Sequence, residues 1–346
     1  MAAIFCSLSS CAATSGKQST TAEFEKLIQT DMNAMLLDVR TPQEFAENHI
    51  PGAINIDQAD PDFISKVKAQ IPADKEIAVY CRSGHRSADA AARLEKEGYK
   101  TADLEGGILA WEQDELPVTH DGNDYYTAPD GKAIEIQPLI HASLRIKYGD
   151  QEIEIDPVGK MGDRSTDYAA FPKADLILVT HEHYDHYDPE AIKTLSKADT
   201  TVITNGNVHE MLGYGTAMKN GDTLALPSGI EIEAVPAYNT TPERSQFHPK
   251  GRDNGYILNL GGLRVYIAGD TEVIPEMKDF KDIDIAFLPC NLPYTMTPAQ
   301  LIEAAEIIKP KVVYPYHYGE TDLSSITPAL AEQGIYVRIC PFDPGK

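Results

Sequence analysis

Short apolar runs alternate with polar segments along the second half of the chain, and several runs end at a histidine or an aspartate. Residues 176–180 read Leu-Ile-Leu-Val-Thr, which is typical of a buried β-strand. A helix start is predicted at Asp188-Pro189-Glu190, with an N-cap, a first-turn proline and a first-turn acid. Apolar runs at 263–269 and 312–316 predict two further strands. The pattern therefore predicts an α/β layout with polar side chains in the loops after strands.

Four metal-binding side chains lie within six residues, directly after the first of these strands. The segment His181-Glu182-His183-Tyr184-Asp185-His186 occupies a strand-to-helix loop. Alternate residues of an extended loop share a side, so His181 and His183 can bind one cation. Asp185 and His186 follow after a turn and can bind a second. Imidazole and carboxylate ligands suit zinc, with iron or manganese as alternatives, and the spacing predicts a site for one or two ions.

Two further ligands are predicted where other strands end. Asp270 follows the apolar run 263–269, and His317 follows the run 312–316. Each is a polar ligand type placed where an apolar strand stops. The metal ligands predicted from the sequence are therefore His181, His183, Asp185, His186, Asp270 and His317.

This pattern resembles the metallo-β-lactamase superfamily, with its H-x-H-x-D-H loop, a later bridging aspartate and a last histidine on a late strand. The resemblance covers roughly Ala133 to Lys346. Within the superfamily, the chain most resembles the branch that contains ascorbate-6-phosphate lactonase, because the segment around His141 recurs in that branch. The resemblance implies an αββα sandwich, a bridging role for Asp270 and a second-site role for His317. His141 either borders the pocket or is a structural residue.

One ligand of that family pattern is missing. The superfamily supplies a third histidine to the first metal before the bridging aspartate, but Asn239 stands at the matching place. A neutral amide oxygen is a poorer zinc ligand than an imidazole. His248 lies in the following loop and is the better replacement, whereas His209 falls at a predicted helix start on the surface. Whether His248 or Asn239 completes the first site stays open at this point.

A second constellation, in the first third of the chain, joins a cysteine to two arginines. The apolar strand 77–80 leads into Cys81, and the alanine-rich segment 87–97 predicts a helix that Gly98 ends. A thiol at a helix N-terminus beside arginines favours the thiolate, and the amides of such a loop bind anions. With four residues between Cys81 and Arg86, the loop suits a persulfide sulfur rather than a phosphate. The expected substrate-binding residues are Arg82, Ser83, Gly84, His85 and Arg86.

Flanking motifs give this segment a resemblance to single-domain rhodanese, from about Thr21 to Thr119. They are a strand at 36–40, a capping box at 41–44, the segment His49–Asn55 and the segment Gly106–Trp111. The resemblance implies a parallel sheet with helices on both faces. It also implies that Cys81 is the catalytic residue that carries the sulfur, and that a donor such as thiosulfate or a persulfide binds the loop.

Length and composition fit two domains. A chain of 346 residues exceeds a typical single domain, and a hydrophobic content of 42% is ordinary for a globular protein. Turn-forming residues between the two resemblances predict a linker. We predict a rhodanese domain at 21–119, a linker at 120–132 and a metallo-β-lactamase-fold domain at 133–346.

Charge gives a first indication of partners. A net charge of −23 argues against nucleic acid, because phosphate contacts need a basic face. A small basic cluster nevertheless lies in the sequence around His248, and its members are Arg244, Lys250 and Arg252. We expect a small-molecule substrate that carries negative charge.

The N-terminus contains part of a targeting signal. Leu8-Ser9-Ser10-Cys11 resembles a bacterial lipobox with Cys11 as the lipidated residue, and residues 1–20 are assigned to this signal and its tether. The expected location is the bacterial cell envelope, as a lipoprotein or periplasmic protein, with the cytoplasm as the alternative. A lipid anchor is then the only expected membrane contact. No disulfide framework is predicted among the remaining cysteines, which are Cys81, Cys290 and Cys340.

Three functions are compatible with these motifs. The first is a sulfurtransferase with a Cys81 persulfide fused to a hydrolase whose metal-bound hydroxide attacks an ester, lactone, thioester or phosphodiester, with Asp185 assisting proton transfer. The second is a persulfide dioxygenase–rhodanese fusion, although Asn239 replaces one ligand of that iron enzyme. The third is a non-catalytic module that senses sulfur or metal.

Overall fold

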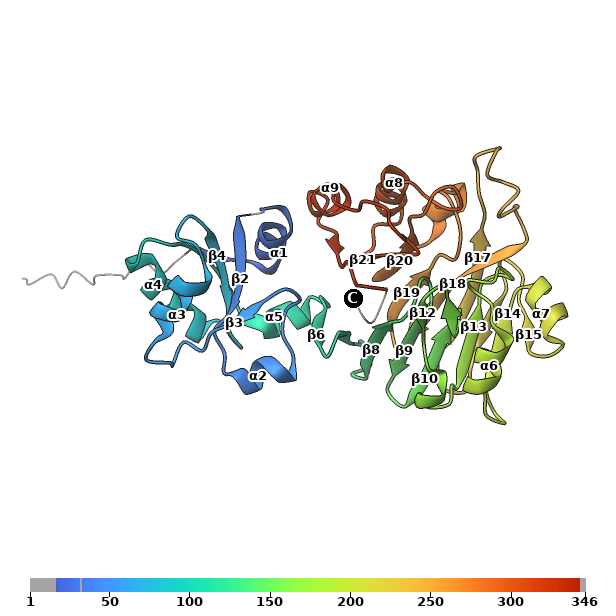
Figure 1. Ribbon diagram of the computed structural model, residues 1–346, viewed down its shortest axis with the longest axis horizontal. Coiled ribbons are helices and arrows are strands. Elements are labelled where there is room, and N and C mark those ends of the chain that lie inside the picture. The colour runs from blue at the N-terminus through green and yellow to red at the C-terminus, as the bar shows by residue number, and fades with distance from the viewer. Residues whose placement is uncertain (1–16, 32, 343–346) are drawn as a thin grey trace, which may run out of the picture. The chain divides into compact units, whose positions relative to one another are not determined.

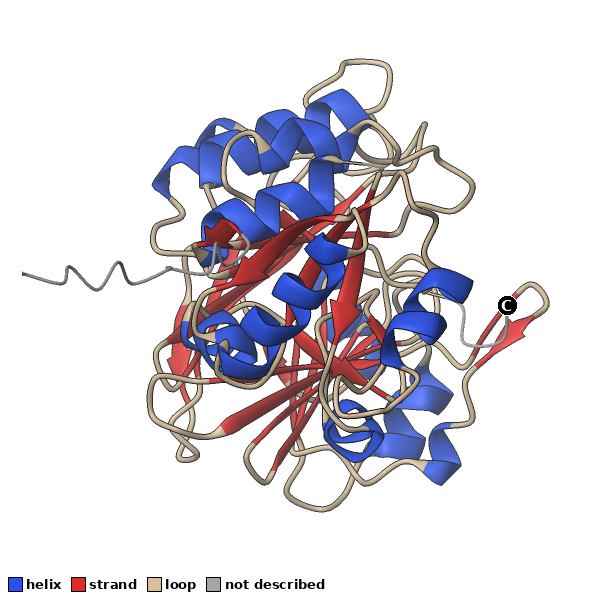
Figure 2. Ribbon diagram, turned by 90° about the vertical axis from the view of Figure 1, so that its left-hand side faces the viewer, coloured by secondary structure: helices blue, strands red, loops and turns tan. Residues whose placement is uncertain are grey.

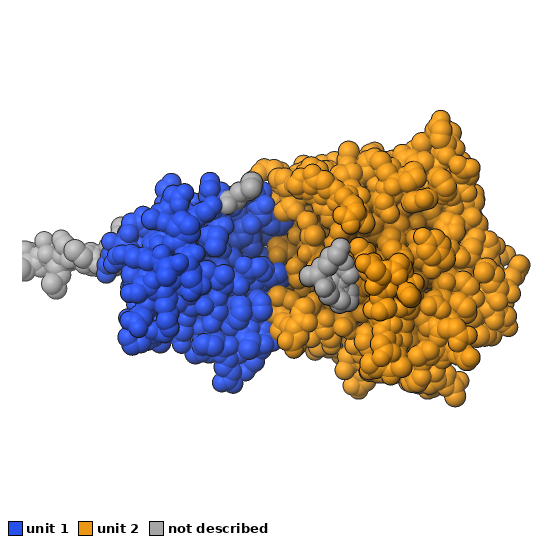
Figure 3. All heavy atoms as spheres, viewed as in Figure 1, with its two compact units in different colours: residues 1–111 blue, residues 112–346 orange. Residues whose placement is uncertain are grey.

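The computed structural model describes residues 17–31 and 33–342, and the chain divides into two compact units (Figure 3). Unit 1 spans residues 1–111 and unit 2 spans residues 112–346. The lipobox-like segment around Cys11 lies outside the described residues. Within the described part of the chain, no helix combines the length and the apolar character needed to cross a bilayer.

Unit 1 is a parallel five-stranded sheet with helices on both faces, as predicted. The strand order is β1-β5-β4-β2-β3, and every neighbouring pair is parallel. Apolar residues of α3 and α4 pack against one face, and Figure 1 shows α1 and α5 on the other. The elements are β1 (Lys17–Ser19), α1 (Thr21–Thr30), β2 (Ala34–Asp38), α2 (Pro42–Glu47), β3 (Ile54–Asn55), α3 (Phe63–Gln70), β4 (Glu76–Tyr80), α4 (His85–Lys96), β5 (Lys100–Leu104) and α5 (Gly107–Gln113).

Helices and strands alternate along unit 1, and local sequence signals explain where the helices begin. Figure 2 distinguishes the helices from the strands by colour. The predicted capping box is present at the start of α2, where the Glu44 N–H donates to Thr41 Oγ1 at 3.2 Å and Pro42 is the first helical residue. The Glu23 N–H makes the same bond to Thr20 at the start of α1. Capping of this kind satisfies backbone donors that the helix itself leaves unpaired.

Unit 2 is a sandwich of two sheets with helices outside each, as predicted. The first sheet has the order β15-β14-β13-β10-β9-β8-β7-β6, and the second has the order β16-β17-β18-β19-β20-β21-β22. Apolar residues of α6 and α7 cover the first sheet, including Ile192 and Val208. Residues of α8 and α9, including Leu301 and Leu330, cover the second (Figure 1).

The strands of the first sheet are β6 (Val118–His120), β7 (Asn123–Thr127), β8 (Ala133–Pro138), β9 (Leu144–Tyr148), β10 (Gln151–Ile155), β13 (Leu176–Val179), β14 (Thr201–Thr204) and β15 (Thr216–Ala217). Those of the second sheet are β16 (Thr223–Ala225), β17 (Glu231–Ala237), β18 (Asp253–Leu260), β19 (Leu263–Ile267), β20 (Ile285–Pro289), β21 (Val312–Tyr316) and β22 (Tyr336–Val337). A separate hairpin is formed by β11 (Lys160–Met161) and β12 (Arg164–Ser165). The helices are η1 (Tyr168–Ala170), α6 (Pro189–Leu195), α7 (Gly206–Leu212), η2 (Pro275–Asp279), α8 (Pro298–Ile308) and α9 (Ile326–Ala331).

The predicted linker at residues 120–132 is wrong in the structure, because most of it belongs to the first sheet of unit 2. Strands β6 and β7 form a hairpin, and β7 pairs with β8. The two residues that turn this hairpin, Asp121 and Gly122, have φ values of 50° and 82°, as a tight two-residue hairpin turn requires. Turn-forming residues were thus correctly recognised, but they connect two strands rather than two domains.

A buried polar network makes the same hairpin part of the sandwich. Asp124 of β7 accepts hydrogen bonds from the Tyr314 hydroxyl of β21 at 2.8 Å and from Arg338 Nη2 at 2.9 Å. The Tyr126 hydroxyl lies 2.6 Å from that of Tyr314. These bonds join the first sheet to the second. A fragment beginning at residue 133 would therefore lose two strands and leave Arg338 without its carboxylate.

Strand direction explains why ligands from distant parts of the sequence meet. In the second sheet β19, β20 and β21 are parallel neighbours, so the residues that follow β19 and β21 lie at the same edge. These residues include Asp270 and His317. In the first sheet β13 runs parallel to β10 and β14 and delivers the loop 181–186. The site is thus built from loops at the carboxyl ends of strands in both sheets.

Candidate functional site

The first group of candidate metal donors consists of His181, His183, His248 and Asp270, whose ligand atoms all lie within 4.8 Å of one another. His181 Nε2 is 3.1 Å from His183 Nδ1, so these two nitrogens lie close enough to bind one ion. His181, His248 and Asp270 are buried, and His183 is partly exposed. Three imidazoles and one carboxylate therefore surround one position.

The second group consists of His141, Asp185, His186 and His317, again within 4.8 Å of one another. Asp185 Oδ2 lies 3.1 Å from His141 Nε2 and 3.5 Å from His317 Nε2. The rings of His141 and His317 are in close contact, with centroids 3.7 Å apart. The second group has the same composition as the first.

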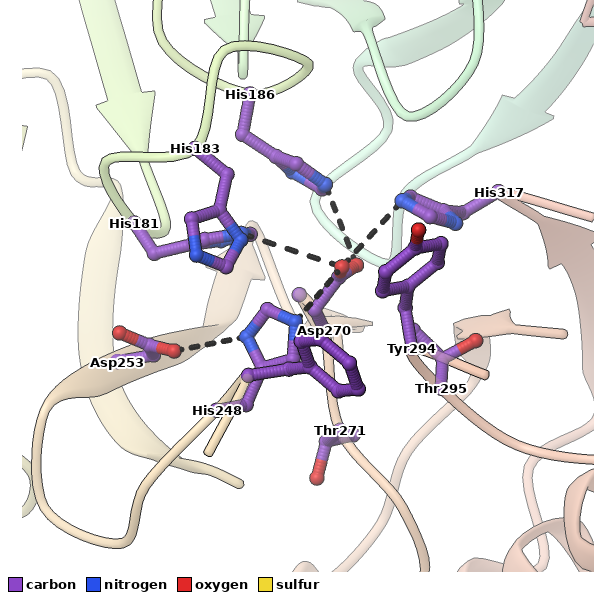
Figure 4. Close-up of polar contacts among 12 residues, drawn as sticks. His181, His183, His186, His248, Asp253, Asp270, Thr271, Tyr294, Thr295 and His317 are labelled. Atoms are coloured by element: carbon purple, nitrogen blue, oxygen red, sulfur yellow. Dashed lines mark hydrogen bonds and ion pairs between the residues drawn. The ribbon is translucent and has the colours of Figure 1, made fainter. Parts of the chain in front are cut away.

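Asp270 lies between the two groups, and Figure 4 shows four imidazoles directed at its carboxylate. Its Oδ1 atom is 3.2 Å from His186 Nε2 in the second group. Its Oδ2 atom is 3.3 Å from His248 Nε2 in the first group and 3.4 Å from His317 Nε2 in the second. This is the placement that a bridging ligand requires.

Carboxylates behind two of the imidazoles orient the rings. His186 Nδ1 lies 2.7 Å from Asp156 Oδ2, and His248 Nδ1 lies 3.0 Å from Asp253 Oδ2. A histidine that donates its Nδ1 proton to a carboxylate presents the Nε2 lone pair on its other side. In both residues that side faces Asp270. A carboxylate that accepts the second ring N–H of a histidine is the arrangement common at metal-binding histidines.

Three residues of the site have left-handed backbone conformations although they are not glycine. The φ values are 60° for His141, 46° for Asp156 and 49° for His317. Each such conformation costs about 1–2 kcal/mol and persists only where surrounding contacts enforce it. One of these contacts is the bond from the His317 N–H to the His141 carbonyl at 3.2 Å. Two of the three, His141 and His317, are donor residues, so part of the backbone strain of the chain lies at the site.

The loop that carries His248 connects β17 to β18 and is fastened at its base by Glu272. This buried carboxylate accepts the backbone N–H groups of Thr240 at 2.7 Å and Thr241 at 2.6 Å, and it pairs with Arg244 at 2.7 Å. Because Glu272 follows Asp270 by two residues, the same strand end supplies a ligand and the anchor of the loop.

Asn239, which stands where the family pattern has a histidine, ties this loop to another one. Its backbone N–H donates to the His248 carbonyl at 2.8 Å. Its side-chain Nδ2 donates to the Tyr294 carbonyl at 2.8 Å and to the Arg244 carbonyl at 3.2 Å. Asn239 therefore positions the backbone around His248, and His248 supplies the third imidazole.

The donor atoms fit divalent cations. Within the described residues, five buried nitrogen or oxygen atoms of these groups have no hydrogen-bond partner, namely His186 Nε2, His248 Nε2, Asp270 Oδ1 and both ring nitrogens of His317. Buried polar atoms are normally paired, so this convergence calls for a charged partner at the centre. Imidazole and carboxylate donors in this number are those that zinc and similar ions prefer.

Electrostatics at the site also favour a cation. Burial acts to raise the pKa of Asp270, but the imidazoles of His317 and His186 outweigh it and hold that pKa well below its usual range. Burial acts to lower the pKa of His248, but the nearby carboxylates of Asp253 and Asp270 outweigh it and raise the pKa to about 9. The carboxylates therefore stay ionised and stabilise positive charge between the rings.

In unit 1 the thiol loop is held closely against the start of α5. The Cys81 carbonyl accepts the Ile108 N–H at 2.9 Å, and the Arg82 carbonyl accepts the Leu109 N–H at 3.2 Å. A Cβ atom on Gly107 would come within 2.5 Å of the Cys81 carbonyl oxygen, so this close approach requires glycine. The predicted Gly106-Gly107 motif thus has a packing role.

The structure distinguishes between the residues expected to bind substrate. Arg86 donates from both terminal nitrogens to Glu44 of α2, at 2.8 and 2.6 Å, and these bonds lower the pKa of Glu44 to about 2. Arg86 is therefore fixed by a carboxylate. Gly84 is buried at the N-cap of α4, whereas Arg82 and Ser83 of the loop and His85, the first residue of α4, are exposed beside the buried Cys81.

Comparison with known proteins agrees with both constellations. Residues 135–317, more than half of the chain, match the β-lactamase superfamily domain. The chain belongs to the β-lactamase superfamily. Residues 20–114 match the rhodanese-like domain.

Relatives of the superfamily domain are metal-dependent hydrolases by description. A UPF0173 metal-dependent hydrolase of Thermococcus kodakarensis is 31% identical over 54% of this chain and 85% of its own length. A crystal structure from Parabacteroides distasonis, of a protein described as a metal-dependent hydrolase, is 54% identical with a TM-score of 0.61, and it covers 63% of this chain and 97% of that one. A metallo hydrolase of Ignicoccus hospitalis shares the fold at 24% identity and a TM-score of 0.53, over 62% of this chain and 96% of that one. The chain is thus a metal-dependent hydrolase of β-lactamase fold with a rhodanese domain.

The six predicted metal ligands lie in the two donor groups, and two further residues complete these groups. His248 was one of two alternatives for the first site, and the structure places it there. His141 was left as a bordering or structural residue, and the structure places it in the second group. The signal for His141 was its recurrence in the resembling branch. The signal for His248 was only its position in a loop after Asn239.

The basic residues near His248 suggested a binding site for an anion, but in the structure each of them pairs with a carboxylate. Arg244 pairs with Glu272, and Lys250 Nζ lies 2.8 Å from Glu276 Oε1. Arg252 Nε lies 2.6 Å from Asp253 Oδ1. Each cation is thus neutralised by a carboxylate of the same fold. Their role is to hold the His248 loop in place.

Proposed function

We propose that unit 2 hydrolyses a small ester, lactone, thioester or phosphodiester with two divalent ions, and that Cys81 of unit 1 transfers sulfur as a persulfide. The observation that carries the hydrolase proposal is the pair of four-residue donor groups that meet at Asp270. Zinc-like ions bound there would polarise the substrate and make water acidic enough to ionise near neutral pH. Two sets of four donors exceed the two histidines and one carboxylate of a mononuclear iron dioxygenase, so hydrolysis is better supported.

Asp185 is the residue to which we assign proton transfer. Its carboxylate is held by His141 and His317, yet the side chain remains 18% exposed, compared with 3% for Asp270. A carboxylate that is fixed in direction and open to the site can accept a proton at Oδ1 or Oδ2 from the attacking water and return it to the leaving group. Asp270 is more fully enclosed by imidazoles, so we assign it cation binding alone.

The size of the adjoining cavity supports a small substrate. A cavity of about 200 Å³ adjoins His141, and its lining includes Arg164, Tyr318 and Glu320. This volume is below the ~300–1,000 Å³ of pockets that hold drug-sized ligands. Arg164 and Glu320 bring opposite charges to this lining, so the class we propose from the cavity is a small polar substrate.

The experiment that tests the hydrolase proposal combines metal analysis with a substrate panel. Protein purified without added metal would be analysed for zinc, iron and manganese, and then assayed with p-nitrophenyl acetate, a γ-lactone, an acyl thioester and bis(p-nitrophenyl) phosphate. We expect about two ions per chain and turnover of at least one class. Fully loaded protein that hydrolyses none of the four classes would contradict the proposal.

Sulfur transfer is supported by the thiol loop. Cys81 is buried beneath a loop whose exposed members are Arg82, Ser83 and His85, so an anionic donor can approach from solvent while the sulfur stays shielded. Formation of thiocyanate from thiosulfate and cyanide by the full chain tests this proposal directly. The absence of thiocyanate at any donor concentration would speak against it.

We further propose that the chain is anchored in the bacterial envelope through Cys11. The support is the lipobox-like segment Leu8-Ser9-Ser10-Cys11 followed by a polar tether. Mass spectrometry of the mature protein from a bacterial host should find a lipid-modified Cys11 at the N-terminus. An unmodified chain that begins at Met1 would favour the cytoplasmic alternative.

The first donor group makes a separate prediction about metal stoichiometry. His248→Ala should lower the metal content from about two ions to about one per chain, because the first position would keep two imidazoles and a shared carboxylate. Asn239→His should not raise it, since the third imidazole is already present and the loop would lose the Asn239 bond to Tyr294. His209→Ala, which changes a histidine of α7 outside both groups, is the control. Two tightly bound ions in His248→Ala would disprove the role of His248.

A further inference from the structure

Three neighbouring strands end at the edge of the second sheet that carries the site, and the middle strand adds no residue to the described donor groups. Strand β20 lies between β19 and β21 and is parallel to both. Asp270 follows β19, and His317 follows β21. The segment that follows β20 therefore begins at the same edge, between the strands that deliver these two ligands. We call residues 291–296 of this segment the rim loop.

The rim loop is fastened to the loop that carries His248. Asn239 Nδ2 donates to the Tyr294 carbonyl at 2.8 Å, and Arg244 Nη1 donates to the Thr295 carbonyl at 3.0 Å. Asn239 also donates its backbone N–H to the His248 carbonyl at 2.8 Å. One asparagine thus joins the rim loop to the residue that supplies the third imidazole of the first donor group.

The rim loop also contacts the loop that carries His317. A Cβ atom placed on Gly319 would lie 3.8 Å from Asn291 Nδ2, which is an ordinary van der Waals distance. Gly319 follows His317 by two residues. Figure 4 shows the Tyr294 side chain extending from the rim loop toward His317. The rim loop therefore borders the site between a ligand of the first group and a ligand of the second.

Hydrogen bonds within the rim loop fix its shape. The Asn291 N–H donates to Thr295 Oγ1 at 2.7 Å. The Asn291 carbonyl accepts the N–H groups of Thr295 at 2.8 Å and Tyr294 at 3.0 Å, and Thr295 itself is fully buried. The residues between the two ends of this turn, 292–294, are all exposed. An ordered loop thus presents them to solvent beside the site.

Two of these exposed residues are large and apolar. Leu292 is 51% exposed and Tyr294 is 45% exposed. The Tyr294 ring meets the half-buried ring of Phe247 edge to face, with 5.1 Å between the centroids, and Phe247 directly precedes His248. Single apolar residues are common on protein surfaces, but a contiguous apolar group beside a site is typical of ligand contact. The rim loop carries no charged residue, so it offers no partner to a charged group of a ligand.

We infer that the rim loop selects the substrate by binding an apolar acyl group against Leu292, Tyr294 and Phe247. The inference rests on the proposed hydrolysis and narrows it to carboxylic esters, lactones and thioesters whose acyl group has several carbon atoms. The scissile carbonyl then lies at the donor groups, and the polar part of the substrate lies in the cavity beside His141. A phosphodiester has no acyl group and gains nothing from this surface.

The test uses linear carboxylates as probes, because each carries the acyl group of a cleaved ester and a head group that binds metal ions. Isothermal titration calorimetry would give the affinities of the zinc-loaded full chain for acetate, butanoate and hexanoate. Full burial of one methylene raises affinity about fourfold, so we expect about twofold per methylene on this open surface. Hexanoate should then bind about sixteenfold more tightly than acetate. Equal affinities for the three probes would overturn the inference.

Substitutions assign the selectivity to the rim loop. Tyr294→Ala and Leu292→Ala should each lower the ratio of the hexanoate and acetate affinities several-fold. Tyr294→Phe keeps the ring and should keep the ratio, which separates packing from hydrogen bonding by the hydroxyl. Tyr214→Ala is the matched control, since Tyr214 is 46% exposed but precedes β15 and lies at the opposite edge of the first sheet from the metal-binding loop. A wild-type ratio in both Tyr294→Ala and Leu292→Ala, at wild-type metal content, would overturn the role of the rim loop.

Binding and turnover can fail separately. The carboxylates are not cleaved, so a chain that hydrolyses no ester would still show the dependence on chain length, and this result would support the rim loop as an apolar binding surface. The esters p-nitrophenyl acetate and p-nitrophenyl hexanoate add the kinetic measurement, in which we expect the lower KM for hexanoate. Hydrolysis of both esters with equal KM values would support the proposed hydrolysis and contradict selection by the rim loop.

Discussion

Asp270→Asn is expected to empty both donor groups and to lower hydrolysis by more than about a hundredfold, a larger loss than removal of a supporting residue causes. The carboxylate faces both groups, at 3.2 Å from His186 Nε2 and 3.3 Å from His248 Nε2. An amide keeps the shape but removes the negative charge and directs N–H groups at one set of imidazoles. Metal content per chain and kcat/KM on the most responsive substrate are the measurements.

A matched control separates loss of the site from loss of the fold. Asp279→Asn changes an exposed carboxylate at the end of η2, in the same part of unit 2, and should retain metal and activity. Thermal unfolding of both variants in chelator compares them without the contribution of bound metal. If Asp270→Asn retained about two ions per chain, the assignment of Asp270 as the shared ligand would be wrong.

Cys81→Ser should abolish thiocyanate formation while metal content and hydrolysis stay at the wild-type level. A serine hydroxyl cannot carry sulfane sulfur, because the thiolate is the nucleophile that forms the persulfide. The two chemical centres lie in different compact units, so we expect loss of one to leave the other intact. The thiosulfate–cyanide assay, hydrolysis and metal analysis on one preparation would measure all three quantities.

A second thiol serves as the control for this result. Cys290 is buried in unit 2, and burial raises its pKa to about 12, so it cannot act as a nucleophile near neutral pH. Cys290→Ala should therefore keep sulfur transfer. Thiocyanate formed by Cys81→Ser would mean that another group carries the sulfur, and the assignment of the thiol loop would fall.

Local patterns in the sequence were sufficient to predict several metal ligands and helix starts of this protein. The loop from His181 to His186 follows an apolar strand, and Asp270 and His317 follow two others. The carboxyl ends of neighbouring parallel strands lie at the same edge of a sheet. The ligands that follow these strands were therefore predictable once the strands were recognised. The capping box at Thr41 and the helix start at Asp188 were predictable for the same reason, since caps depend on residues within one turn.

Only the tertiary structure decided which residues complete the site and where the units divide. His248 reaches its place because Glu272 and Asn239 hold its loop, and His141 because strained backbone brings it beside His317. The predicted linker became a hairpin because Asp124 bonds to Tyr314 of β21 across the sandwich. The spacing of residues along the chain reflects interactions between residues that are close in the sequence. Contacts between distant loops and strands depend on packing of the whole domain, which no local pattern contains.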